Sequence, residues 1–136
     1  MAAEQREDGA VSHFVPNVGL FTKDPTLFCG GSEWADAAVI CPWQLYQAYG
    51  DKELLREHLP MMQKWVEYVC RAAGDSCIWS TGHHYGDWLA LDAGEGNYTG
   101  ASRKEFIATA FYAHSAQLLA QAMDALDMDG AAQFEV

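Results

Sequence analysis

Apolar side chains recur at helical spacing in the middle of the chain. Steps of 4, 3, 4, 3 and 4 separate Leu55, Leu59, Met62, Val66, Val69 and Ala73. Because residues three or four apart share one face of an α-helix, this stripe predicts an amphipathic helix that ends before Gly74. Pro60 removes a backbone donor, so it predicts a split into a short turn and a longer helix.

A second apolar stretch lies just before this one and predicts a helix over residues 34–49. Residues 37–41 are apolar on every side, which is typical of a helix buried by several neighbours. Gly50 is suited to end a helix, and Asp51 is suited to cap the next one. Since so short a connection forces its two helices to run antiparallel, residues 34–73 are predicted to form a helical hairpin.

A third helix is predicted to begin at the sequence S-x-x-E formed by Ser102 and Glu105, which matches a capping box. One apolar face is predicted for Ile107, Phe111, Leu118, Ala122 and Ala125. A fourth helix is expected to begin near Gly130. No strand-like alternation of useful length occurs, so the predicted fold class is all-α and built of hairpins.

Two regions lack helical periodicity. Residues 1–31 are interrupted by prolines and glycines and predict an extended N-terminal segment, whereas residues 32–136 predict helical hairpins. Within the second region, a long loop is predicted at about residues 75–101. Loops of this length in compact domains are usually functional or disordered. The aromatic residues of this loop argue against disorder.

The long loop mixes aromatic and polar side chains: Trp79, His83, His84, Tyr85, Asp87, Trp88 and Asp92. This mixture fits a polyol ligand, because pyranose C–H faces pack on aromatic rings and hydroxyls bond carboxylates and imidazoles. The same rings could instead anchor the loop on the helices, and composition does not separate the two hypotheses. A metal site at His83 and His84 is disfavoured, because adjacent residues rarely face one ion and no partner has zinc-like spacing.

Composition excludes several classes of function. The chain has 136 residues, is 50% apolar and carries a net charge of -11, which would repel nucleic acids and anionic membranes. Its longest apolar run, Ala37 to Trp43, is far short of the roughly 20 residues that cross a bilayer. Residues 1–9 are polar and acidic, unlike a secretory signal, so a cytoplasmic location is favoured.

The four cysteines are predicted to be free thiols, because no pair forms a C-x-x-C motif and the chain is not disulfide-dense. Cys41 and Cys70 fall within apolar helical stretches and are predicted to pack as small hydrophobic residues. Cys29 and Cys77 lie in predicted loops, and the sequence leaves their state open.

Three motifs, taken in order, resemble the α-L-rhamnosidases of the six-hairpin glycosidase group. They are W-A-D-A-A-V-I-C-P-W-Q-L-Y at residues 34–46 with Y-G-D at residues 49–51, G-D-W-L at residues 86–89, and K-E-F-I-A-T-A at residues 104–110. The resemblance implies an (α/α)6 barrel of twelve helices in two rings, of which this chain would supply about a third. It also implies a glycoside hydrolase that removes terminal α-L-rhamnose with inversion.

The resemblance further implies a set of pocket residues. Trp34 and Trp88 would form aromatic walls, with Asp36 and Asp87 as nearby polar groups, and the loop composition adds His84 and Tyr85. Capping is the competing role for both aspartates. The motif gives Glu33, beside Trp34, no catalytic role.

The family's acid motif lies upstream of this region and its base lies downstream. Neither motif is matched here, so no catalytic residue is assigned and the isolated chain is expected to be inactive. No cofactor or metal is implied. The expected partners are a rhamnose-containing glycoside or oligosaccharide and the remaining helices of the parent barrel.

Two other functions compete with this hypothesis. One is another six-hairpin carbohydrase of the debranching or trehalase-like type, since one fold hosts several specificities. The other is a non-enzymatic interaction module, in which acidic helices and loop aromatics contact a protein. A comparison of the cleavage of aryl rhamnosides and aryl glucosides would distinguish the two enzyme hypotheses. Binding of a protein partner in the absence of sugar would test the interaction-module hypothesis.

Overall fold

The computed structural model describes residues 1–18 and 28–134. These ranges contain three long helices: α1 (Ala37–Tyr49), α2 (Lys52–Ala73) and α3 (Lys104–Ala125). They also contain three short 3-10 turns: η1 (Ala2–Glu4), η3 (Gly74–Ser76) and η4 (Ala131–Phe134). In the described ranges the only strand-like pairings are isolated bridges, Ser12 with Cys29 and Trp88 with Thr99. The all-α prediction is confirmed.

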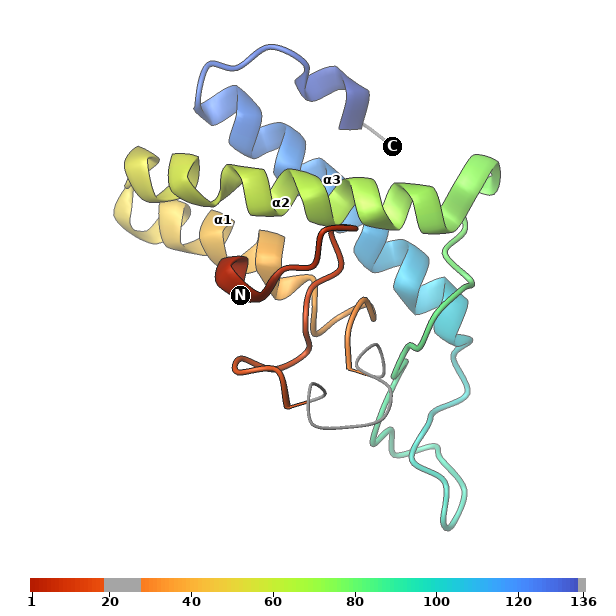
Figure 1. The fold of residues 1–136 in the computed structure, drawn as a ribbon. Helices are drawn as coiled ribbons and strands as arrows, with labels where there is room; N and C mark the ends of the chain where they lie inside the picture. The colour runs from red at the N-terminus through yellow and green to blue at the C-terminus, as the bar shows by residue number, and fades with distance from the viewer. Residues whose placement is uncertain (19–27, 135–136) are drawn as a thin grey trace.

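The predicted hairpin is formed by α1 and α2, which lie side by side and run antiparallel (Figure 1). Gly50 ends α1 in a left-handed conformation with φ of 68°, and its N–H donates to the Tyr46 carbonyl. The Asp51 carboxylate then accepts from the N–H groups of Glu53 and Leu54, each at 3.0 Å. The stop and cap residues therefore behave as predicted. Helix α1 begins at Ala37, three residues later than expected.

The predicted split at Pro60 is wrong, because α2 continues without a break from Lys52 to Ala73. Pro60 lies on the exposed face of the helix. Water can therefore satisfy the carbonyl of Arg56 that loses its partner. The opposite face is held by the predicted stripe, whose six apolar residues are all buried.

Helix α3 departs from two predictions. Its N-cap is Arg103, which makes no side-chain cap bond, and the Glu105 carboxylate pairs with the Arg103 guanidinium. The predicted capping box is therefore wrong. Ile107 and Phe111 are only half-buried. The buried face is rotated from the predicted one and comprises Ala108, Tyr112, Ser115, Ala116, Leu118, Leu119, Ala120, Ala122 and Met123.

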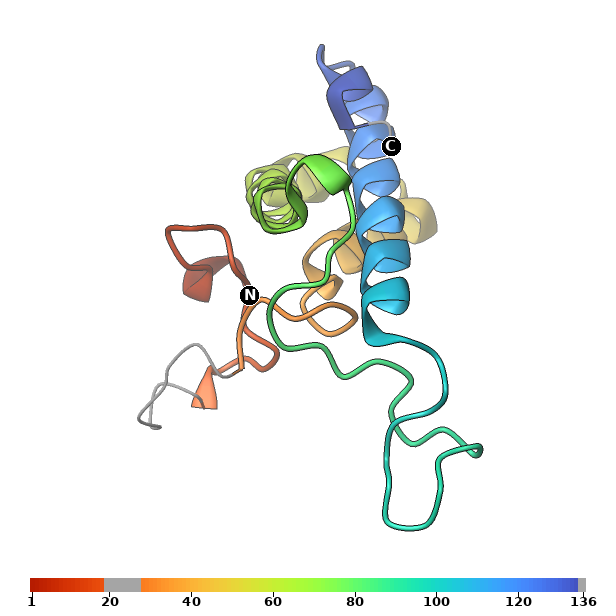
Figure 2. The same cartoon turned by 90° about the vertical axis from the view of Figure 1, so that its right-hand side faces the viewer.

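The core lies where α3 crosses the hairpin. In Figure 2, α2 is seen nearly along its axis while α3 runs up the picture, so the two helices cross steeply. Two tryptophans, Trp65 of α2 and Trp79 of the long loop, are the largest fully buried side chains. Their rings contact each other edge to face at 5.8 Å between centroids. The start of the long loop is therefore anchored in the helical core.

The irregular segments that precede α1 and α3 lie on the same side of the helices. Residues 28–36 lead into α1 and the long loop leads into α3, so both enter their helices from this side (Figure 1). The N-terminal segment packs along α2, where the Gln5 side-chain amide donates to the Met61 carbonyl at 3.1 Å. Part of the predicted extended segment, residues 19–27, lies outside the described residues.

The cysteines differ from expectation in their burial. Cys41, Cys70 and Cys77 are free thiols, and all three are exposed. The prediction that Cys41 and Cys70 pack as small hydrophobic residues is wrong for the described part of the chain, because both lie on exposed faces of their helices. The Asn17 side-chain amide contacts the Cys29 sulfur at 3.5 Å. Among the described helices, none is long and apolar enough to span a bilayer.

Candidate functional site

An aromatic hollow of about 390 Å³ opens at the N-terminal ends of α1 and α3. Three segments meet there: the turn before α1, the middle of the long loop and the first turns of α3. The lining residues are Glu33, Trp34, Tyr85, Gly86, Asp87, Trp88, Ile107 and Phe111. Ring faces and carboxylates therefore converge from segments that are far apart in the sequence.

Three rings form the wall of the aromatic hollow. Tyr85, Trp34 and Trp88 contact one another, with ring centroids 5.5 Å apart for Tyr85 and Trp34, 5.6 Å for Tyr85 and Trp88, and 6.4 Å for the two tryptophans. Phe14 supports the outer side of Trp34 edge to face at 5.2 Å. Trp34 is 38% exposed and Trp88 is 48% exposed. Both tryptophans are therefore partly accessible to a ligand in the hollow.

Backbone bonds hold the G-D-W-L segment in place. The Leu89 N–H donates to the Tyr98 carbonyl at 2.6 Å, and the Gly100 N–H donates to the Asp87 carbonyl at 2.8 Å. Gly86 has φ of 69°, and a Cβ on it would lie 2.8 Å from Lys104 Cγ. Glycine therefore suits this position because of its left-handed conformation, and the Lys104 side chain packs closely against it.

Glu33 lines the aromatic hollow beside Trp34, with a backbone φ of 71° that few side-chain-bearing residues adopt. Burial raises the pKa of its carboxyl. Hydrogen bonds that the carboxylate accepts from the Ser32 hydroxyl and the Gly86 N–H lower this pKa and partly offset the effect of burial. Because Gly86 belongs to the long loop, the Glu33 carboxylate joins the turn before α1 to the segment that carries Trp88. Sequence reasoning dismissed this residue because it considered only a catalytic role.

In the turn before α1, three consecutive backbone N–H groups donate hydrogen bonds to side chains. The Gly31 N–H donates to His13 Nε2 at 2.9 Å, and the Ser32 N–H donates to His84 Nδ1 at 3.2 Å. The Glu33 N–H donates to Asp36 Oδ2 at 2.8 Å. We call residues 31–34 with these bonds the clamped turn. It fixes the approach of Trp34 to the aromatic hollow.

Asp36 is fully buried behind the aromatic hollow. Its Oδ1 accepts from the Trp65 indole N–H at 2.9 Å and from the Ser115 hydroxyl at 2.6 Å. Burial raises the pKa of this carboxyl, while the bonds from Ser115 and Trp65 act against that shift. Asp36 precedes α1 as its N-cap residue but makes no side-chain cap bond. Its carboxylate instead ties the turn to α2 and α3.

The structure divides the six predicted site residues into two groups. Trp34, Tyr85, Asp87 and Trp88 line the aromatic hollow. Asp36 and His84 lie behind it, buried and bonded to other parts of the chain. Sequence reasoning did not place Ile107 and Phe111 at the hollow, because their positions on α3 were assigned to the core. The signal that could have placed them is their position in the first two turns after the loop.

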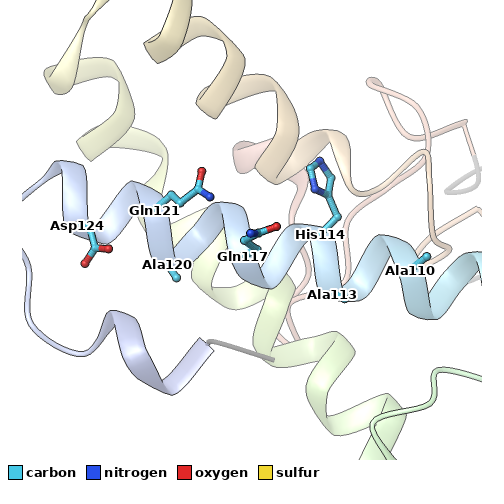
Figure 3. Close-up of a pocket in the computed structure, with 7 residues that line it drawn as sticks. All are labelled: Ala110, Ala113, His114, Gln117, Ala120, Gln121 and Asp124. Carbon is cyan, nitrogen blue, oxygen red and sulfur yellow. The ribbon is translucent and has the colours of Figure 1, made fainter.

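A second hollow of about 540 Å³ runs along α3 (Figure 3). Its lining residues are Ala110, Ala113, His114, Gln117, Ala120, Gln121 and Asp124. All of them belong to one helix and none has an aromatic ring large enough to stack on a pyranose. Within the described residues, this groove therefore lacks the convergence of segments that distinguishes the aromatic hollow.

Comparison with solved structures defines the class of protein. The crystal structure of Streptomyces avermitilis α-L-rhamnosidase complexed with L-rhamnose matches 98% of this chain with a TM-score of 0.78 and 36% identity. That of Aspergillus terreus α-L-rhamnosidase matches 71% with a TM-score of 0.64 and 31% identity. The chain covers 11% of each of these structures. Its fold is thus part of the helical toroid of a six-hairpin glycosidase.

Sequence comparison gives the family. The α-L-rhamnosidases of Streptomyces avermitilis and Formosa agariphila are 38% and 34% identical to this chain over 127 and 122 residues. These matches cover 93% and 90% of the chain but only 11% and 12% of the relatives. A family model described as the bacterial alpha-L-rhamnosidase 6 hairpin glycosidase domain matches residues 1–135. The chain belongs to this family, and the family and partial toroid implied by its motifs are confirmed.

Proposed function

We propose that this chain forms part of the catalytic domain of an inverting glycoside hydrolase that removes terminal α-L-rhamnose from glycosides. The observation that carries the proposal is the aromatic hollow, which is lined by the partly exposed Trp34 and Trp88 together with the acidic residues Glu33 and Asp87. Its volume of about 390 Å³ falls within the range of small-ligand sites.

The residues of the aromatic hollow suit a deoxy sugar. A rhamnose ring has C–H faces and a methyl group that pack on indole and phenyl rings, and hydroxyls that donate to carboxylates. Trp34, Tyr85 and Trp88 supply the rings, and Ile107 and Phe111 supply the opposite apolar side. Asp87 is exposed and Glu33 is half-buried, so both carboxylates have room to accept a hydroxyl.

The proposed contribution of this segment is binding and orientation. Inverting hydrolysis needs a carboxylic acid and a carboxylate base about 6.5–9.5 Å apart, with a water between the base and the sugar. The motifs for these two groups are not matched in this chain, so other parts of the intact enzyme would supply them. A wall that fixes the sugar ring raises the rate by holding it in reactive geometry.

The proposed partners follow from the same reasoning. A rhamnose-containing glycoside or oligosaccharide is the proposed substrate, supported by the crystal structure of the Streptomyces avermitilis relative complexed with L-rhamnose. The remaining helices of the barrel are the second partner. Large apolar side chains such as Phe106, which is 72% exposed, and Tyr49, which is 79% exposed, would be covered by them.

The test uses the intact protein that carries this segment. We expect it to hydrolyse a chromogenic α-L-rhamnoside and to leave the matching β-D-glucoside uncleaved. Trp88→Ala should lower kcat/KM for the rhamnoside by about tenfold to hundredfold, because the ring both binds and orients the sugar. Tyr98→Ala is the control, since Tyr98 is an exposed aromatic of the same loop outside the hollow. Equal kinetic constants for the two variants would show that the aromatic hollow is not part of the sugar site.

A further inference from the structure

We propose that His13 and His84 are positioning residues for Trp34, acting as neutral hydrogen-bond acceptors that hold the clamped turn. The inference rests on the proposed function, in which Trp34 forms one wall of the sugar site. Neither imidazole lines the aromatic hollow. Each reaches the clamped turn from a different segment, one from the N-terminal segment and one from the long loop.

The bonds of His13 define its tautomer. Its Nε2 faces the Gly31 N–H at 2.9 Å and must accept, which leaves the proton on Nδ1. That Nδ1 lies 3.2 Å from the Tyr85 hydroxyl, to which it donates. One imidazole therefore connects the clamped turn with Tyr85, the ring that contacts both tryptophans. Gly31 permits this contact, because a Cβ there would lie 2.6 Å from His13 Nε2.

The bonds of His84 define the opposite tautomer. Its Nδ1 accepts from the Ser32 N–H at 3.2 Å, and the Ser32 hydroxyl lies 3.1 Å from the same atom. Its Nε2 lies 2.9 Å from the Thr81 carbonyl, which can only accept, so the proton is on Nε2. The ring is buried against Trp79 at 4.5 Å between centroids. This packing leaves the imidazole little freedom to turn.

The position of Trp34 depends on these two acceptors. The Trp34 N–H donates to the Ser32 carbonyl at 2.9 Å, so the residue that carries the ring is bonded within the clamped turn. His13 and His84 are 6% and 5% exposed. A Gly31 or Ser32 N–H that lost its acceptor there would be buried without a partner. Such a loss is costly enough to shift the backbone.

Protonation would remove either acceptor. Burial, together with the nearby His83 and His84, lowers the pKa of His13 to about 4. Burial also lowers the pKa of His84. The bond to the Thr81 carbonyl and the charge of Glu105 oppose that shift, whereas His83 and Lys104 add to it. Both imidazoles are therefore neutral near pH 7, as the hydrogen bonds require.

The test compares acceptor-keeping with acceptor-removing variants in the intact protein. Gln places a carbonyl oxygen near the Nε2 position and Asn places one near Nδ1, so His13→Gln and His84→Asn keep the acceptor. His13→Leu and His84→Leu remove it. We expect the Leu variants to lose about tenfold to hundredfold in kcat/KM for a chromogenic α-L-rhamnoside. The Gln and Asn variants should recover most of this loss, and His58→Leu on α2 should match wild type.

Crystal structures of the variants separate this inference from the proposed function. We expect Trp34 to be displaced relative to Tyr85 in the Leu variants and to keep its place in the Gln and Asn variants. This result would support the positioning role of the two histidines whether or not the wild type cleaves rhamnosides. An unmoved Trp34 in folded Leu variants overturns the inference. So does an equal loss of activity in both kinds of variant.

If the Leu variants do not fold, the pH profile decides. As the pH falls from 6 towards 4, kcat/KM of the wild type should fall more steeply than that of His13→Gln. The reason is that the His13 imidazole can gain a proton and lose its acceptor, whereas the Gln amide cannot. Parallel profiles for the two proteins would overturn the inference for His13.

Discussion

Replacing Asp36 by alanine should destabilise the helical core far more than any exposed aspartate does. The fully buried carboxylate accepts from the Trp65 indole, the Ser115 hydroxyl and the Glu33 N–H at 2.9, 2.6 and 2.8 Å. Each buried donor left without an acceptor costs about 1–3 kcal/mol. The Ser115 hydroxyl can rotate to another acceptor, so the expected loss in the free energy of unfolding is on the order of 4 kcal/mol.

The assay is urea unfolding of the chain followed by far-ultraviolet circular dichroism. Asp51→Ala is the matched control, because Asp51 also accepts two N–H groups, at 3.0 Å each, but is exposed. Its loss should cost only about 1 kcal/mol, typical of an N-cap. A loss of 4 kcal/mol is a large share of the roughly 5–15 kcal/mol that stabilises an ordinary domain. Asp36→Ala should therefore lose most of its cooperative transition.

The pH dependence gives the same prediction a second test. Because burial raises the pKa of Asp36 in the folded state, the folded chain binds this proton more tightly than the unfolded chain. Wild type should therefore gain stability relative to Asp36→Asn as the pH falls from the raised pKa towards the model-peptide value of about 3.9. Equal losses for Asp36→Ala and Asp51→Ala, or a pH-independent difference between wild type and Asp36→Asn, would refute the reasoning.

Three further results are expected. The isolated chain should show no turnover of a chromogenic α-L-rhamnoside while the intact protein does, since a general acid and base each supply about 10²- to 10⁴-fold; turnover by the chain at a typical glycosidase rate would contradict this. Exposed apolar side chains such as Phe106, at 72%, should make the isolated chain bind a hydrophobic dye and associate; a strict monomer that binds no dye would show that these side chains need no covering partner. Gly31→Ala should destabilise the chain by about 1–3 kcal/mol, because its Cβ would lie 2.5 Å from the His83 carbonyl, whereas Gly94→Ala, with open space around it, should be neutral; equal melting temperatures would contradict this packing.

Local patterns predicted the helices well. The stripe on α2 and the stop and cap at Gly50 and Asp51 depend on neighbours within one or two turns, and all were correct. The errors lie where distant contacts decide. Pro60 is tolerated because the opposite face of α2 is buried, and the α3 face is set by its crossing with the hairpin.

The candidate site could be predicted only in part. Trp34, Asp87 and Trp88, which line the aromatic hollow, were predicted from motifs, and Tyr85 from the mixed composition of the loop. Asp36 and His84 were predicted from the same signals, but the structure places their polar atoms on buried partners from other segments. His13 and Glu33 carry no local pattern. Their contacts with the clamped turn and with Gly86 arise only when the long loop folds back on the residues before α1.

The most direct test of the sugar site is a crystal structure of the intact protein with L-rhamnose. We expect the sugar ring to lie against Trp34 and Trp88, with its hydroxyls within hydrogen-bond distance of Asp87 or Glu33. Trp88→Ala crystals, soaked in the same way, should show the site empty or the sugar disordered. Rhamnose bound elsewhere in the barrel, with the aromatic hollow filled only by solvent, would contradict the account.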